Sequence, residues 1–65
     1  MDTIEVVKAE IKKLSSQAVT AKLDLHDLSE DLPTGWERIP EVAARTYETY
    51  QKLATARQKL AGLGG

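Results

Sequence analysis

Residues 4–32, which read IEVVKAEIKKLSSQAVTAKLDLHDLSEDL, decide the fold of this chain. Apolar side chains recur in this stretch with alternating spacings of three and four residues, the pattern of a helix that packs along a partner helix. The positions in this seam are Ile4, Val7, Ile11, Leu14, Ala18, Ala21, Leu25, Leu28 and Leu32. We therefore predict a helix over residues 3–29, with the seam side chains, Leu14 and Leu25 alike, buried against a second helix.

The start of this helix carries a capping signal. Asp2 is followed three residues later by Glu5, which is the spacing of a capping box, in which each side chain accepts a hydrogen bond from a backbone N–H at the helix start. The far end is marked by Leu32-Pro33-Thr34-Gly35, where the fixed φ of proline and the permissive glycine end regular structure. We expect a loop over residues 30–39.

A second helix is predicted over residues 40–61. Pro40 suits the first helical turn because its missing N–H would be unpaired there, and Glu41 lies near the positive end of the helix dipole. The second seam consists of Ile39, Val42, Thr46, Thr49, Leu53, Ala56 and Leu60. The glycine-rich residues 62–65 should end the helix and fray.

Two long helices joined by a short connection must fold back on each other to bury their seams. The prediction is therefore an all-α fold, a single coiled-coil-like domain over residues 1–65 built as an antiparallel two-helix hairpin. Tyr47 and Tyr50 widen the apolar face of the second helix beyond what one partner helix covers. We expect the hairpin to self-associate into a four-helix bundle, with Tyr47, Tyr50 and Leu53 at the oligomer interface.

Composition excludes several classes of function. The chain has 65 residues, 42% of them hydrophobic and 29% charged, and its net charge is -1. So short a chain builds no enclosed catalytic pocket, and a charge this low does not favour nucleic acid as a partner. Cysteine is absent, no apolar run is long enough to span a membrane, and no signal peptide opens the chain. We expect a cytoplasmic protein that is not an enzyme and carries no cofactor.

The segment around the only histidine is unusual for the end of a helix. Asp24, Asp27, Glu30 and Asp31 surround His26, although carboxylates in the last turn oppose the helix dipole. One interpretation is a site for a cation, a metal or a basic partner, and a weak metal site would use His26 with Glu30, one turn apart. The other is that Arg38, Arg45 and loop N–H groups neutralise these carboxylates within the chain.

Trp36 in the loop also allows two interpretations. It can fold back to close the open end of the hairpin near Leu32 and Ile39, or it can stand out as an anchor for a partner. We expect the closing role, and we keep Trp36 with Asp24, His26, Asp27 and Glu30 in the candidate partner-binding set.

The central part of the chain resembles a known family. Residues 21–36, AKLDLHDLSEDLPTGW, continue through Ile39, Pro40 and Ala43 to the TYETY of residues 46–50. This stretch, nearly half of the chain, is similar to the small nitrogen-fixation-associated proteins encoded beside the nitrogenase cofactor-maturation genes of diazotrophic bacteria. The family's motif positions fall here on Lys22, Asp24, His26, Asp27, Glu30, Leu32, Pro33, Trp36, Ile39, Tyr47 and Tyr50.

The resemblance implies a self-associating helical hairpin that is not an enzyme and works in nitrogenase assembly or maintenance. Its partner would be the nitrogenase molybdenum-iron protein in an immature, cofactor-deficient or damaged state, or the cofactor-maturation proteins that carry the cofactor to it. Two other functions remain open from the residues themselves. One is a generic oligomeric coiled-coil adaptor, and the other is a metal-carrying protein that uses His26.

Overall fold

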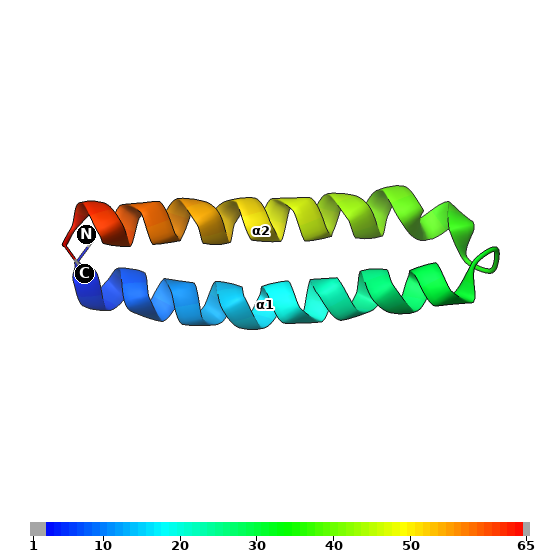
Figure 1. Cartoon of the computed structure of the whole chain (residues 1–65), viewed down its shortest axis with the longest axis horizontal. Helices are drawn as coiled ribbons and strands as arrows, with labels where there is room; N and C mark the ends of the chain where they lie inside the picture. The colour runs from blue at the N-terminus through cyan, green and yellow to red at the C-terminus, as the bar shows by residue number, and fades with distance from the viewer. Residues whose placement is uncertain (1–2, 65) are drawn as a thin grey trace.

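The chain forms an antiparallel helical hairpin, as Figure 1 shows for the computed structural model, which describes residues 3–64. Helix α1 spans Ile4–Asp31, a short 3-10 helix η1 spans Trp36–Arg38, and helix α2 spans Ile39–Gly62. The rod measures 46 × 16 × 15 Å, and both ends of the chain lie at the end opposite the connecting loop. The predicted all-α hairpin is confirmed, and residues 3–64 contain no strand.

Helix α1 starts with a different cap from the one expected. The hydroxyl of Thr3 accepts a hydrogen bond from the backbone N–H of Val6 at 3.2 Å, so Thr3 is the N-cap. Asp2, the expected capping residue, lies outside the described residues. A threonine hydroxyl at the N-cap accepts a hydrogen bond from a first-turn N–H by itself. A capping box would also require a Glu or Gln three residues later, where this helix has Val6.

Both helices are longer than their sequence patterns suggest. Helix α1 continues to Asp31, two residues past the expected end at 29, and helix α2 runs from Ile39 to Gly62 instead of over 40–61. The expected loop over 30–39 is reduced to residues 32–35 and the single turn of η1. Near the C-terminus the backbone N–H of Leu63 donates to the carbonyl groups of Lys59 and Leu60, which closes the last turn of α2.

The turn between the helices is held by backbone hydrogen bonds. The N–H of Thr34 donates to the carbonyl of Asp31 at 2.9 Å, and the N–H of Arg38 donates to that of Gly35 at the same distance. Gly35 has a φ of 79°, a conformation that favours glycine, and a Cβ at this position would lie 3.3 Å from Cδ1 of Leu28. The turn therefore depends on glycine both for its backbone angle and for space.

One of the two seam rows of α1 is buried more completely than the other. The row Val7, Leu14, Ala21 and Leu28 is 0 to 8% exposed. In the second row Ala18 is buried and Ile11 is partly buried, but Ile4, Leu25 and Leu32 are 36 to 40% exposed. The expectation that Leu25 is buried like Leu14 is therefore wrong. The first row points directly at α2, whereas the second row lies at the edge of the contact.

The centre of the core is small. Leu14 and Ala18 pack there with Leu53 and Ala56 of α2, and Ile11 covers the edge of this cluster. Alanines at two of these four positions let the helix axes approach closely, but they also bury little apolar area. No helix within residues 3–64 is long and apolar enough to cross a membrane.

Candidate functional site

The loop end of the hairpin carries most of the candidate binding residues on exposed helix and turn surface. His26, Asp27 and Glu30 lie in the last turns of α1, which contains no basic residue in its final turn. Their side chains are 61%, 77% and 69% exposed. The acidic cluster thus lies at the negative end of the α1 dipole, where carboxylates lower helix stability.

His26 lies between the two carboxylates. Its Nδ1 is 3.6 Å from Oδ1 of Asp27, and its Nε2 is 3.4 Å from Oε1 of Glu30, one helical turn away. The hydroxyl of Ser29 donates to the backbone carbonyl of His26 at 2.8 Å. Within residues 3–64, no group of three or more His, Asp or Glu side chains is arranged to hold a metal ion. His26 with Glu30 thus provides two ligand atoms without a third.

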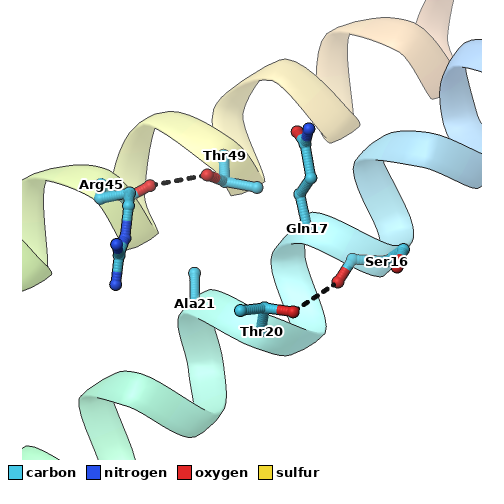
Figure 2. A pocket seen from close by; sticks show the side chains of 6 residues that line it. All are labelled: Ser16, Gln17, Thr20, Ala21, Arg45 and Thr49. Carbon is cyan, nitrogen blue, oxygen red and sulfur yellow. Dashed lines mark hydrogen bonds between the residues drawn. The ribbon is translucent and has the colours of Figure 1, made fainter.

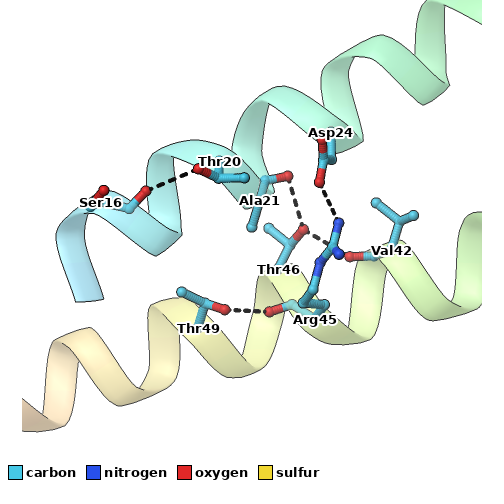
Figure 3. Close-up of polar contacts among 8 residues, drawn as sticks. All are labelled: Ser16, Thr20, Ala21, Asp24, Val42, Arg45, Thr46 and Thr49. Carbon is cyan, nitrogen blue, oxygen red and sulfur yellow. Dashed lines mark hydrogen bonds and ion pairs between the residues drawn. The ribbon is translucent and has the colours of Figure 1, made fainter. Parts of the chain in front are cut away.

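Asp24 has a different environment from the rest of the cluster. Its carboxylate forms an ion pair with the guanidinium of Arg45 on α2, and its side chain is 41% exposed (Figure 3). Next to this pair, the hydroxyl of Thr46 donates to the carbonyl of Val42 at 2.8 Å and lies 3.4 Å from that of Ala21 on the other helix. The carboxylate of Asp24 is therefore neutralised within the chain, by Arg45.

The same neutralisation does not extend to the tip of the hairpin. Within residues 3–64, Arg38 forms no ion pair with Asp27, Glu30 or Asp31, and the side chain within 4 Å of the carboxylates of Asp27 and Glu30 is the imidazole of His26. The carboxylates of Asp27 and Glu30 thus remain available at the surface.

Trp36 stands out from the loop end. It is the first residue of η1 and is 61% exposed. The expectation that Trp36 closes the open end of the hairpin is wrong. Leu28 packs under the turn instead: it is 6% exposed, and its Cδ1 would lie 3.3 Å from a Cβ at Gly35.

The three residues expected at an oligomer interface differ in exposure. Tyr47 and Tyr50 are 69% and 42% exposed, so both present surface to a partner. Leu53 does not, because it is 4% exposed and belongs to the hairpin's own core. The assignment of Leu53 to an outer interface is thus corrected: its position in the second seam turns it toward α1.

Mostly charged residues recur on the same side of both helices, and one pair of them, Asp24 with Arg45, forms an ion pair between the helices. In this antiparallel pair the residue numbers of opposing positions add up to 69, as for Asp24 and Arg45. The charge-ladder face, as we name it, consists of Glu10, Gln17, Asp24 and Asp31 on α1 and Arg38, Arg45, Lys52 and Lys59 on α2. The sequence of one helix does not reveal this face. Acidic residues recur at multiples of seven on α1 and basic residues at multiples of seven on α2. Sequence reasoning could have found the face by aligning the two helices in an antiparallel register.

Two open grooves lie along the charge-ladder face. The larger, of about 340 Å³, is lined by Ser16, Gln17, Thr20, Ala21, Arg45 and Thr49 (Figure 2). The hydroxyl groups of Thr20 and Thr49 donate to carbonyl groups of their own helices, so they do not point freely into the groove. The second groove, of about 230 Å³, is lined by Glu10, Gln51, Lys52, Thr55, Ala56 and Lys59. Both are open surface depressions.

Comparison with known proteins agrees with this hairpin. A model of the Rop-like family matches residues 2–64. The NMR structure of a Northeast Structural Genomics Consortium target superimposes with a TM-score of 0.90 at 54% sequence identity, covering 97% of this chain and 89% of that chain. The hairpin is thus shared by an experimentally determined relative along almost its whole length.

Curated relatives come from several bacteria. A UPF0437 protein of Azorhizobium caulinodans is 62% identical over 60 residues, covering 92% of this chain and 87% of the relative. A Frankia alni relative, described as a UPF0437 protein in the nifX-nifW intergenic region, is 57% identical over 44 residues, which cover 68% of this chain and 54% of that protein. The resemblance to a small nitrogen-fixation-linked hairpin family is confirmed. This chain belongs to the Rop-like family of helical hairpins and is a relative of the UPF0437 proteins.

Proposed function

We propose that this chain is a non-enzymatic accessory factor of nitrogen fixation that docks through the loop end of its hairpin. The proposed partner is the nitrogenase molybdenum-iron protein in an immature, cofactor-deficient or damaged state, or a cofactor-maturation protein that delivers the cofactor to it. The observation that carries the proposal is Trp36, which is 61% exposed at the same end of the hairpin as the exposed carboxylates of Asp27 and Glu30. The nifX-nifW location of the Frankia alni relative supports the link to nitrogen fixation, and the Rop-like family supports the helical hairpin that presents the tip.

The docking surface combines one apolar anchor with two charges. Tryptophan is enriched among the residues that dominate binding energy, because its large ring buries extensive area in a partner pocket. The carboxylates of Asp27 and Glu30 would orient the tip toward a basic patch on the partner and exclude partners with acidic patches. The backbone hydrogen bonds that hold the turn order the tip before binding, which lowers the entropy cost of association.

A protein of this kind acts by binding one state of its partner more tightly than another. If the tip recognises a surface that is open only while the cofactor site is incomplete, binding shifts the partner's population toward that state. No group on the hairpin then needs to react. The partner is held until the cofactor arrives, and closure of the partner's surface releases the hairpin.

The test is an affinity pull-down of the tagged chain from nitrogen-fixing cells, with ammonium-grown cells as the background. We expect the wild type to retain a nitrogenase component, and Trp36→Ala or the double variant Asp27→Lys with Glu30→Lys to lose it. Matched controls away from the tip are Val6→Ala, also an exposed apolar residue at 50%, and Glu5→Lys with Glu48→Lys, which changes the net charge equally. Circular dichroism of each variant checks that the hairpin is intact.

The outcomes separate the alternative functions. Binding that survives both tip variants moves the contact to the helix flanks, as a generic coiled-coil adaptor requires, and contradicts the proposed docking surface. Binding that disappears with a chelator and returns with added metal favours a metal carrier that uses His26. Absence of every nitrogenase component from the wild-type sample refutes the proposal.

A further inference from the structure

The outer side of α1 carries a second, shorter stripe. Residues two before and two after an inward-facing residue lie about 160° around the helix from it, so they point away from the partner helix. Four such positions flank the buried Ala21 and Leu28. We name these four residues the outer stripe: Val19, Leu23, His26 and Glu30. Their spacing of four, three and four residues places them along one line on the side of α1 opposite α2.

The outer stripe has an apolar half and a polar half. Val19 and Leu23 are 55% and 54% exposed, and the side chains of His26 and Glu30 are 61% and 69% exposed. The distance from Val19 to Glu30 along the helix axis is about 17 Å, or three turns. The stripe therefore extends from the carboxylates of the proposed docking surface to the middle of α1.

The core of the hairpin does not account for the apolar half of this stripe. Val19 and Leu23 do not belong to the cluster in which Leu14 and Ala18 pack against α2. The same outward line continues toward the open end of the hairpin through smaller or polar residues: Ser16, Lys12, Ala9 and Glu5. Large apolar side chains on this line are therefore confined to the part of α1 that adjoins the acidic cluster.

A second hairpin does not account for Leu23 and Glu30 either. In a four-helix bundle each helix packs against its neighbours through inward positions and turns its outermost side to solvent. Leu23 and Glu30 each follow an inward-facing residue by two positions and point away from α2. They thus stay at the surface whether the hairpin is alone or part of a bundle.

The tip alone offers a small contact. Stable protein interfaces bury roughly 800 Å² per partner, and exposed charge pairs add little free energy. One tryptophan such as Trp36 buries about 150 to 250 Å². A stable complex therefore needs further apolar surface next to the tip, and the outer stripe provides it.

We propose that the partner binds α1 lengthwise, in a groove that receives the outer stripe, with Leu23 as a second apolar anchor besides Trp36. Helices that bind in a groove present anchors at spacings of three and four residues, as this stripe does. The occupant is the partner of the tip, because Asp27 and Glu30 follow Leu23 by one and two turns, and a surface that contacts these carboxylates also meets Leu23.

This inference rests on the proposed function and adds its mode of binding. The groove would be apolar where it faces Val19 and Leu23, and basic where it faces Glu30. Among the proposed partners, the inference commits to the cofactor-deficient molybdenum-iron protein. Helix α2 would lie on the far side of α1 from this groove, so its own outer side would remain free.

The first experiment measures the Kd of the full chain for purified cofactor-deficient molybdenum-iron protein by biolayer interferometry. We expect Leu23→Ala to raise the Kd about tenfold or more, and Val19→Ala to raise it by less. Val6→Ala is the matched control, because Val6 is 50% exposed on the same helix but lies about 25 Å from Leu23 along the axis. Thermal melts and sedimentation equilibrium should be unchanged in Leu23→Ala, because Leu23 lies outside the core.

The second experiment locates the partner on the hairpin, and it uses the absence of native cysteine. Val19→Cys on α1 is compared with Ala44→Cys, which follows the buried Val42 by two residues and so lies on the outer side of α2. Each variant is alkylated with a thiol reagent, with and without excess cofactor-deficient molybdenum-iron protein, and the label on the hairpin is measured by mass spectrometry. We expect the partner to protect Val19→Cys and to leave Ala44→Cys as reactive as before.

The outcomes separate this inference from the proposed function. If Trp36→Ala weakens binding and Leu23→Ala behaves like Val6→Ala, the tip docks as proposed and the lengthwise contact is wrong. Protection of Ala44→Cys without protection of Val19→Cys places the partner on α2 and also overturns the inference.

Two further results would contradict the lengthwise contact. Dissociation of a wild-type assembly by Leu23→Ala assigns Leu23 to a contact between copies. Failure of the wild type to bind cofactor-deficient molybdenum-iron protein removes the committed occupant, and the pull-down then decides separately whether a cofactor-maturation protein is the partner of the tip.

Discussion

The unequal burial of the two seam rows leads to a quantitative prediction for Leu14→Ala and Leu25→Ala. The change removes three carbon atoms, each worth about 0.8 kcal/mol when fully buried, or about 2.4 kcal/mol in all. Leu14 is 8% exposed at the centre of the core, so a cavity adds to this loss and the expected cost is about 3 to 5 kcal/mol. Leu25 is 36% exposed, so about two-thirds of the transfer free energy is lost, or about 1.5 kcal/mol, with little cavity.

The difference should be large in a protein of this size. A domain of 65 residues has a total stability of roughly 3 to 10 kcal/mol. Leu14→Ala should therefore leave the chain partly or wholly unfolded, whereas Leu25→Ala should remain folded with a lower urea midpoint. The assay is urea denaturation followed by circular dichroism, with all variants at one protein concentration because association stabilises the folded state. Lys12→Ala, on exposed surface, should change stability by less than about 0.5 kcal/mol.

Protein concentration adds a second check. Leu25 is 36% exposed, so if the expected four-helix bundle covers it, the cost of Leu25→Ala should rise at protein concentrations where the hairpin self-associates. Leu14 is already buried within the hairpin, so the cost of Leu14→Ala should not depend on concentration in this way. Equal losses for the two variants in dilute solution would refute the assignment of one buried and one marginal seam row.

Three further predictions concern the turn, the first cap and the charge ladder. Gly35→Ala should destabilise the hairpin by about 1 to 2 kcal/mol because Gly35 has a positive φ. Gly62→Ala has open space around it and should be neutral or stabilise the hairpin by up to about 1 kcal/mol. A smaller decrease in the urea midpoint for Gly35→Ala than for Gly62→Ala contradicts the turn geometry. Thr3→Ala should cost about 0.5 to 2 kcal/mol through loss of the cap, measured in the same way, and an unchanged midpoint would show that the cap contributes nothing. A double-mutant cycle on Asp24 and Arg45 should give a coupling free energy of about 0.2 to 1 kcal/mol that decreases as salt is added. A larger coupling free energy that does not change with salt would contradict the partial exposure of this ion pair.

Most of the fold follows from local patterns that the sequence contains in full. The alternating spacing of three and four residues defines an apolar stripe on each helix, and the Pro33 and Gly35 turn lies between them. Two such stripes can be buried only by an antiparallel hairpin, so length and periodicity suffice. The cluster at Asp27 and Glu30 was also predictable, because its opposition to the helix dipole is visible without a structure.

What only the tertiary structure decided is how the stripes are rotated toward each other and how the turn is filled. A stripe covers a wide arc of the helix, and the rotation of the two helices selects which row lies at the centre: Leu14 is buried and Leu25 is half-exposed although the pattern treats them alike. The same rotation pairs Asp24 with Arg45, 21 residues away in the chain, and turns Leu53 inward. At the loop, Leu28 occupies the space beneath Gly35, which leaves Trp36 exposed. These outcomes depend on competition between side chains from distant positions for one small volume, which no local pattern records.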